Sequence, residues 1–185
     1  KLFMLFGDAN PTKTFNGKPN GPNDPPRRWD FNDGPIAFTT DTNGDHCPKF
    51  DVVTDSIGAY KNPIVLNAQG QPAISEKINE GPVSGFGANG KMYVFWMTDN
   101  NVYLIGGPSP ANGLGFSTRL VLSVSVDDGK TFRYLYDFSK GSDAKFINVA
   151  IADGGNGYLY FWGVQGGKMF RHSATYFARK KTADI

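Results

Sequence analysis

Asp41, Asn43 and Asp45 place three oxygen-bearing side chains at alternate positions of one short segment. Calcium-binding loops begin in this way, with ligands at their first, third and fifth positions. However, His46 stands where the sharp-turn glycine of such a loop belongs, and Val52 stands where its bidentate glutamate belongs. We therefore expect an Asx-rich turn and no bound cofactor, with a calcium ion as the alternative.

Residues 125–132, with the sequence SVDDGKTF, form a second polar motif, and its side chains suit a tight hairpin. Asp127 can accept hydrogen bonds from turn amides, Gly129 can adopt a positive φ, and the Thr131 hydroxyl can cap the loop. We therefore expect Asp127 and Asp128 to build a turn and not to catalyse a reaction.

The segments on both sides of this motif are predicted to be strands. Residues 119–124 are rich in apolar and β-branched side chains, and residues 132–138 alternate large apolar residues with others at a period of two. An antiparallel strand pair that brackets the turn follows from this pattern.

The composition favours many short strands joined by tight turns and argues against long helices. Aromatic residues make up 14% of the 185 residues, and the chain has 23 glycines and 12 prolines. No apolar run is long enough to cross a bilayer. The net charge of +2 does not indicate nucleic-acid binding, and the basic run at residues 179–181 is expected to be a solvated end. Cys47 is the single cysteine, so no disulfide forms within the chain.

Further short strands are expected in the first half of the chain. Residues 1–6 are almost entirely apolar, which predicts a buried strand that ends at Gly7-Asp8. Residues 10–30 are rich in Pro, Gly and Asn and predict a long loop. Other strands are expected at residues 35–40, 50–53 and 64–66.

Residues 87–96 and 154–163 repeat one pattern, in which a turn rich in Gly and Asn leads into a strand that ends in an aromatic pair. Residues 2–7 fit the same template. Strands are expected after each template strand, at residues 36–40, 120–124 and 170–177, and before two of the turns, at residues 82–86 and 146–151. Self-similar four-strand units of this size are typical of β-propeller blades.

The repeat predicts an all-β chain in which residues 1–185 form a single β-propeller domain with about three blades. The blades are expected near residues 1–75, 76–140 and 141–185, and the first lacks its innermost strand. Propellers close with roughly four to eight blades. The domain is therefore expected to be incomplete, with the remaining blades on the same parent polypeptide or on a second chain.

Two resemblances to known families rest on these motifs. Residues 125–132 resemble the Asp-box hairpin of sialidase-like β-propellers at all five of its defining positions. The order of motifs along the chain resembles a bacterial and fungal family of five-bladed propellers. The motifs that carry this resemblance are Gly7-Asp8 and the segments at residues 29–33, 80–85 and 145–149. That family was long described as a domain of unknown function, and some members cleave D-arabinan. The chain is more distantly similar to arabinanase and fructosidase propellers, and the resemblance covers most of it, as the N-terminal three-fifths of such a domain.

The five-bladed resemblance implies a sugar-binding funnel lined by the innermost strands, with acidic residues converging on its axis. Mapped by position, the catalytic candidates are Asp8, Asp33 and Glu80. In the third blade, Asn148 stands where an acidic residue is expected, and Asp153 lies in the following turn. We assign these two residues to substrate binding.

Acid–base hydrolysis is the chemistry that such residues could perform. Glycoside cleavage needs one protonated carboxyl group for the leaving oxygen and one ionised carboxylate as nucleophile or base. Asp8 follows an apolar run, which suits a protonated acid. Trp29 and Trp96 offer ring faces on which sugar rings pack. We therefore expect a secreted or extracellular glycoside hydrolase that acts on furanose-containing polysaccharide such as arabinan.

Other functions are compatible with the same residues. One alternative is a non-catalytic carbohydrate-binding or adhesin propeller, and another is a scaffold that binds protein partners on its loops. Asp8 and Asp33 could instead cap turns, Glu80 could be a surface residue, and Trp96 could fill the core. A carboxylate pair across the funnel would favour the hydrolase.

Overall fold

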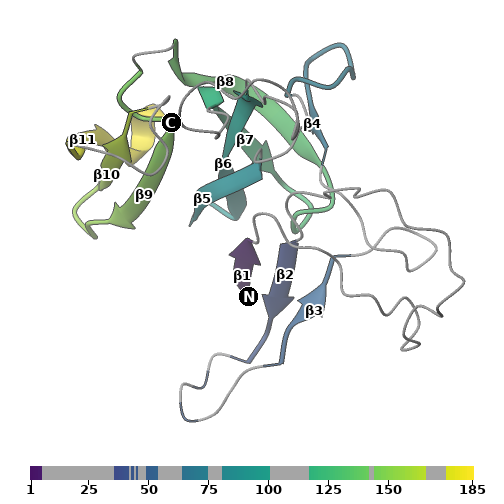
Figure 1. The fold of residues 1–185 in the computed structure, drawn as a ribbon. Helices are drawn as coiled ribbons and strands as arrows, with labels where there is room; N and C mark the ends of the chain where they lie inside the picture. The colour runs from purple at the N-terminus through teal and green to yellow at the C-terminus, as the bar shows by residue number, and fades with distance from the viewer. Residues whose placement is uncertain are drawn as a thin grey trace, which may run out of the picture.

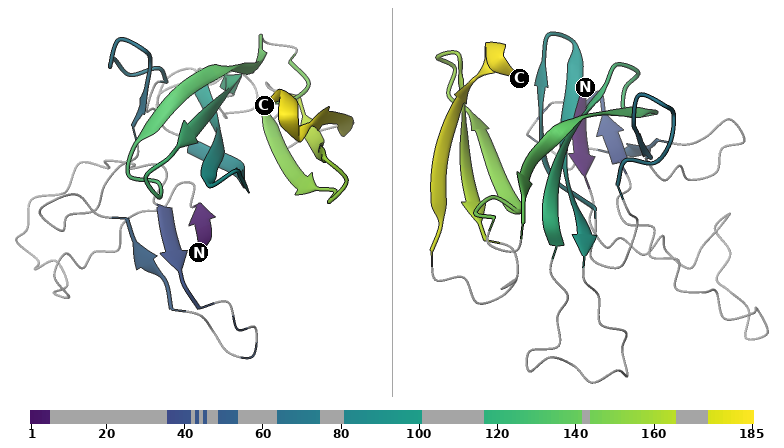
Figure 2. Two further views of the ribbon diagram at one scale, coloured as in Figure 1. Left: turned by 180° about the vertical axis from the view of Figure 1, so that it is seen from behind. Right: turned by 90° about the horizontal axis from the view of Figure 1, so that it is seen from above.

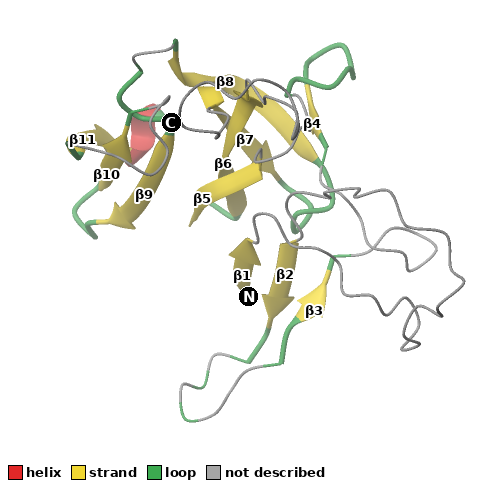
Figure 3. Ribbon diagram, in the orientation of Figure 1, coloured by secondary structure: helices red, strands yellow, loops and turns green. Residues whose placement is uncertain are grey.

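The computed structural model describes residues 1–5, 36–41, 43, 45, 49–53, 64–74, 81–100, 117–141, 144–165 and 174–185. Within these residues the chain is all-β, as predicted, apart from one short 3-10 helix, η2 (Thr182–Asp184). Eleven strands form three sheets (Figure 1), and tight turns join several of them (Figure 3). The described residues include no helix that is long and apolar enough to cross a membrane.

The three sheets follow one another along the chain. The N-terminal sheet contains β1 (Leu2–Leu5), β2 (Ile36–Thr39) and β3 (Asp51–Val52). The central sheet contains β4 (Val65–Leu66), β5 (Gly81–Ala88), β6 (Lys91–Asn100), β7 (Ser117–Ser125) and β8 (Phe132–Lys140). The third sheet contains β9 (Asn148–Asp153), β10 (Tyr158–Val164) and β11 (Tyr176–Lys181).

The central sheet is mixed and curls into a half-barrel (Figure 2). Strands β5 to β8 form an antiparallel meander, and β4 pairs in parallel with β8 at its edge. The predicted strands at residues 35–40, 50–53 and 64–66 are found as β2, β3 and β4. The predicted antiparallel pair of residues 119–124 and 132–138 is also confirmed, because β7 and β8 pair from Arg119–Lys140 to Val124–Arg133.

Two apolar cores lie on opposite faces of the central sheet. One core joins it to the N-terminal sheet and includes Ile36, Trp96 and Phe132. The other joins it to the third sheet and includes Phe95 and Phe161. Neighbouring residues of a strand point to opposite faces, so the adjacent Phe95 and Trp96 serve different cores. The long apolar runs of β6 and β7 are explained by this burial on both faces.

The turn between β7 and β8 is held by its own side chains. The Gly129 amide donates to Ser125 Oγ (2.9 Å), and the Thr131 amide and hydroxyl donate to the Asp127 carboxylate (2.9 and 2.6 Å). Gly129 adopts a φ of 82°, which a residue without a Cβ tolerates best. Partial burial acts to raise the pKa of Asp127, but the hydrogen bonds from Thr131 and Ser125 outweigh it and lower that pKa. The predicted turn role of this motif is therefore confirmed.

The sequence prediction of a buried first strand is wrong. Leu2 and Met4 are exposed, while Phe3 and Leu5 pack on the first core. Among the described residues β1 pairs only with β2, so one of its edges has no strand partner there.

The basic run at residues 179–181 is exposed at Arg179 and Lys181, as predicted for a solvated end, but it also belongs to β11 and pairs with β10. The Lys180 amine donates to the Tyr136 hydroxyl (3.0 Å), and the Arg179 guanidinium lies over the Tyr158 ring. Long basic side chains can pack their stems on a sheet while their charges stay in water. The strand was predicted at residues 170–177, but β11 begins at Tyr176, and residues 166–173 lie outside the described residues.

Replacing Asp127 by alanine should destabilise the protein by about 1 kcal/mol at neutral pH, because the turn loses the acceptor for the Thr131 donors. A lowered pKa in the folded state means that the carboxylate stabilises the protein above the ordinary pKa of 3.8. This stabilisation is lost as the pH falls through the lower, folded-state pKa. Urea unfolding at neutral and acidic pH measures both effects.

Asp128→Asn is the matched control, because Asp128 also lies in this turn but only meets Lys1 in an exposed ion pair. It should cost little at either pH. Equal losses in the two variants, or an Asp127→Ala deficit that persists unchanged in acid, would contradict this account of the turn.

Candidate functional site

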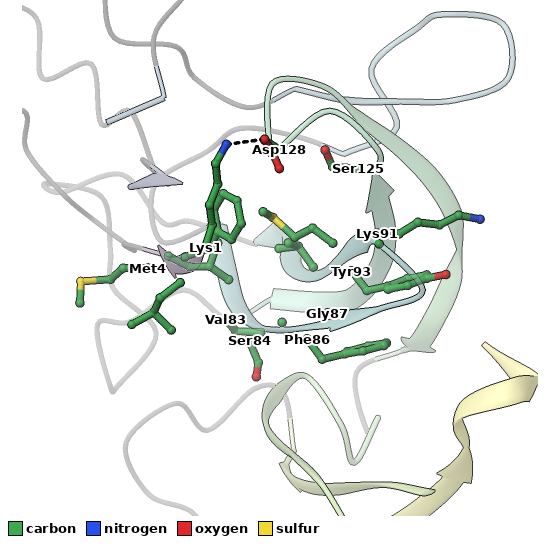
Figure 4. A pocket seen from close by; sticks show the side chains of 17 residues that line it. Lys1, Met4, Val83, Ser84, Phe86, Gly87, Lys91, Tyr93, Ser125 and Asp128 are labelled. Atoms are coloured by element: carbon green, nitrogen blue, oxygen red, sulfur yellow. Dashed lines mark hydrogen bonds and ion pairs between the residues drawn. The ribbon is translucent and has the colours of Figure 1, made fainter. Parts of the chain in front are cut away.

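A cavity of about 600 Å³ lies between β1 and the β5–β6 hairpin (Figure 4). Its described lining is mainly apolar and includes Leu5 and the stacked rings of Phe86 and Tyr93, whose centroids are 4.8 Å apart. The Lys1 amine and the Asp128 carboxylate form an ion pair of 2.5 Å at its border. This cavity is a concave surface that the described residues provide.

The polar groups of the cavity suit binding better than acid–base hydrolysis. Asp128 is the one carboxylate among the described lining residues, and it is already paired with Lys1. The other polar residues of the lining include Ser84, Tyr93 and Lys91. Hydroxyls and an amine can hydrogen-bond a polyhydroxyl ligand, but hydrolysis needs a second carboxyl group.

The close pairing of β5 with β6 depends on Gly85. A Cβ at this position would lie 2.7 Å from the Tyr93 carbonyl oxygen on β6 and 3.4 Å from Leu5 Cδ1 on β1. The first distance is shorter than real Cβ contacts, so the backbone would have to move. Gly85 therefore lets β5 and β6 lie close together in the wall of the cavity.

Four of the six predicted site residues lie outside the described residues. They are Asp8, Trp29, Asp33 and Glu80. Their roles stay predictions. The ends of the strands that flank them are described, however. Leu5 and Ile36 are direct partners in the β1–β2 register, so the segment between them leaves and returns at one end of this strand pair.

Asn148 and Asp153 are described, and the structure does not bring them together. They are the first and last residues of β9 and are both exposed. A six-residue strand separates its end residues by roughly 17 Å, and odd spacing puts them on opposite faces. The Asp153 carboxylate accepts the Gly155 amide (2.9 Å), so it caps the following turn. Asn148 is the exposed polar residue with which β9 begins.

Trp96 fills the core and offers no sugar platform. Its ring is buried, its Nε1 donates to Ser123 Oγ (2.7 Å), and its ring packs edge-on against Phe132 at 5.3 Å. Buried indole N–H groups usually find such a partner.

The residues with calcium-loop spacing form consecutive Asx turns. The Asn43 amide donates to Asp41 Oδ1 (3.0 Å), and the Asp45 amide donates to Asn43 Oδ1 (3.1 Å). Asn and Asp often hold a turn in this way. In the described part of the chain, no three His, Cys, Asp or Glu side chains are grouped so that they could hold a metal ion.

Sequence reasoning missed a charged network inside the central sheet. The Arg119 guanidinium on β7 donates to Asp99 (2.8 Å), to Asp137 (3.0 Å) and to the Ala73 carbonyl (2.9 Å). The Tyr134 hydroxyl also donates to Asp137 (3.1 Å). An arginine within an apolar strand was the one available signal, since a charge that leaves water needs partners.

The pKa shifts in this network follow from burial and charge. Burial acts to lower the pKa of Arg119, but the bonds to Asp99 and Asp137 outweigh it and raise that pKa. Burial, and then the negative charge of Asp137, raise the pKa of Tyr134. With both pKa values raised, Arg119 is charged and Tyr134 is neutral at neutral pH. The network therefore braces the sheet, because it links β6, β7, β8 and the segment after β4.

The comparisons with known proteins do not assign this chain to a family. No protein-family model matches it, and no curated protein matches it.

Replacing Gly85 by alanine should destabilise the protein by about 1–3 kcal/mol, the usual cost of overpacking a well-packed site. The added methyl group would clash with the Tyr93 carbonyl and disturb the pairing of β5 with β6. Urea unfolding measures the loss, and hydrogen exchange of the β5 amides should show faster opening of this strand pair.

Gly87→Ala provides the control on the same strand and the same cavity wall. A Cβ at Gly87 would meet nothing nearer than the Lys91 carbonyl at 3.9 Å. This variant should stay within about 0.5 kcal/mol of the parent. If Gly85→Ala is as stable as Gly87→Ala, then Gly85 does not govern the close pairing of β5 with β6.

Proposed function

We propose that this chain is part of a β-propeller that binds and cleaves furanose-containing polysaccharide such as arabinan. The proposal assigns the three sheets to three blades of a ring, five in the family that the sequence resembles. The remaining blades come from the same parent polypeptide or from a second chain. The protein is then a secreted or extracellular glycoside hydrolase.

The arrangement of the sheets supports the propeller. Each sheet packs face to face on the next in chain order, as neighbouring blades do. The edge strands β1, β5 and β9 of the three sheets also meet, since β1 contacts β5 and β5 contacts β9. The side-chain bonds of the β7–β8 turn suit the Asp-box resemblance, because every polar position of that motif takes part in the turn.

The observation that carries the site proposal is the pairing of Leu5 with Ile36. Asp8 follows Leu5 by three residues, and Asp33 precedes Ile36 by three residues. Three residues span at most roughly 11 Å. Two carboxylates that are 25 positions apart in the sequence are therefore tethered to the same end of one strand pair.

Glu80 and Asn148 complete the proposed funnel. Glu80 directly precedes β5, and Asn148 opens β9, so each stands at the start of an edge strand of its sheet. Asn148 has no acidic proton and would hold a sugar hydroxyl. The proton-transfer pair must then come from Asp8, Asp33 and Glu80, with one residue protonated to assist the leaving oxygen and one ionised.

Non-catalytic carbohydrate binding is the alternative. The presence of Asn148 at the third expected acidic position favours it, as does a cavity with one described carboxylate. In this alternative the protein retains the sugar site and lacks a working acid pair.

Asp8→Asn in the complete protein tests the proposal on a panel of arabinans. The variant should bind the polysaccharide like the parent and melt at the same temperature. Its turnover should fall by roughly 10²- to 10⁴-fold, the contribution of a positioned proton-transfer group. Calorimetry measures binding, and reducing-sugar release measures turnover.

Asp51→Asn is the control, because Asp51 is an exposed carboxylate on β3, away from the proposed funnel. It should leave turnover unchanged. A parent protein that binds arabinan without cleaving it would establish the non-catalytic alternative. A parent that neither binds nor cleaves any glycan of the panel would refute both functions.

A further inference from the structure

The internal repeat carries an Asn-Gly pair in each of its two turns. The sequence has six such pairs. Two of them lie wholly within the described residues, where Asn89-Gly90 joins β5 to β6 and Asn156-Gly157 lies between β9 and β10. Asparagine loses its side-chain amide most readily before glycine, because no side chain shields the glycine nitrogen from the carboxamide. The two turns therefore carry the same potential reaction.

The two asparagine side chains are held very differently. The Asn156 carboxamide is fixed at both of its ends, because its Nδ2 donates to the Tyr160 hydroxyl (3.1 Å) and its Oδ1 accepts the Tyr158 amide (3.3 Å). Asn89 is exposed, and its side chain has no hydrogen-bond partner within the residues that the structure describes. The structure thus separates two sites that the sequence makes alike.

Asn89 and Gly90 form the tip of a two-residue hairpin. Ala88 pairs with Lys91 across the tip, and the two central residues have positive φ values of 51° and 69°. Positive φ at both positions is typical of a type I′ turn, which favours this dipeptide. Strand β6 pairs with β7 from Met92 onward, so the tip extends beyond β7. Opening the tip disturbs one residue pair, and such local openings need little free energy.

We propose that Asn89 is a spontaneous modification site of the folded protein, at which the side-chain amide is lost. The Gly90 amide nitrogen attacks Asn89 Cγ and releases its proton to solvent, while ammonia leaves from Cγ with a proton from solvent. Water then opens the resulting succinimide ring at either carbonyl. One opening gives aspartate, and the other gives isoaspartate, in which the main chain runs through the former side chain. Water is the only co-reactant.

The two products affect this turn differently. Aspartate tolerates a positive φ much as asparagine does, so it adds a negative charge two residues before Lys91 and leaves the hairpin intact. Isoaspartate adds a carbon atom to the main chain between residues 89 and 90. A two-residue turn cannot take up this extra length unless the Ala88–Lys91 pair opens. Gly90 and Lys91 line the cavity, so isoaspartate also changes the cavity wall.

The hydrogen bonds of Asn156 set the expected difference in rate. Both bonds must break before this carboxamide can turn towards the Gly157 nitrogen. Each bond of ordinary strength favours the held form several-fold, so Asn89 should lose its amide roughly tenfold faster in the folded protein. Unfolding removes the bonds, and the two Asn-Gly pairs should then react at similar rates. The reaction involves only groups of the hairpin, so it does not depend on the proposed glycan function.

Ageing of the protein in mildly alkaline buffer, once folded and once in concentrated urea, tests the proposal. Peptide mapping by mass spectrometry follows the conversion of amide to acid at both sites, and water enriched in heavy oxygen labels the conversions that precede digestion. Tyr160→Phe is the matched variant, because it removes one bond to the Asn156 carboxamide and keeps a ring against Phe177. It should speed the loss at Asn156 roughly two- to tenfold and leave the rate at Asn89 unchanged.

Hydrogen exchange of the Lys91 amide measures the structural consequence. Aged protein that contains isoaspartate should exchange this amide faster, whereas Asn89→Asp should exchange it like the parent. An Asn89 amide that stays intact in the folded protein would overturn the proposal, and so would equal rates at Asn89 and Asn156. A rate ratio in urea as large as that in the folded protein would also overturn it, because the sequence and not the structure would then decide the rates.

Discussion

Burial of the central sheet on both faces is the constraint on which the rest of the structure depends. Phe95 and Trp96 are adjacent, yet each lies at the centre of a different core. Full burial of one such side chain contributes about 1.5–3 kcal/mol. In the described part of the chain, the N-terminal and third sheets have three strands each, and a single sheet needs a second layer to bury its apolar face. They are ordered because the central sheet offers each of them an apolar face.

Polar side chains of the central sheet form hydrogen bonds with one another, which offsets the free-energy cost of burying them between two apolar cores. Arg119 lies in a strand with two largely apolar faces, and its charge is balanced by Asp99 and Asp137. Ser123 satisfies the indole N–H of Trp96. A buried donor without a partner would cost roughly 1–3 kcal/mol. The sheet is therefore braced by side-chain bonds at the points where its cores are most crowded.

The same stacking links the fold to the proposed function. Strand β1 lies against β5, and β5 in turn lies against β9. In the proposed function, Asp8, Asp33, Glu80 and Asn148 lie within three residues of the ends of strands in these sheets, as a funnel of catalytic and binding side chains would require.

Local features were predictable from the sequence. The turn at residues 125–132 and the strands around it depend on residues close in the chain, so the types of Asp127 and Thr131 were sufficient. The all-β class followed in the same way. Only the tertiary structure decided which side of β1 is buried, where Arg119 finds its partners, and that residues 179–181 belong to a strand. Each of these depends on a contact between distant segments. Sequence periodicity shows which residues share a face, but not what lies opposite that face.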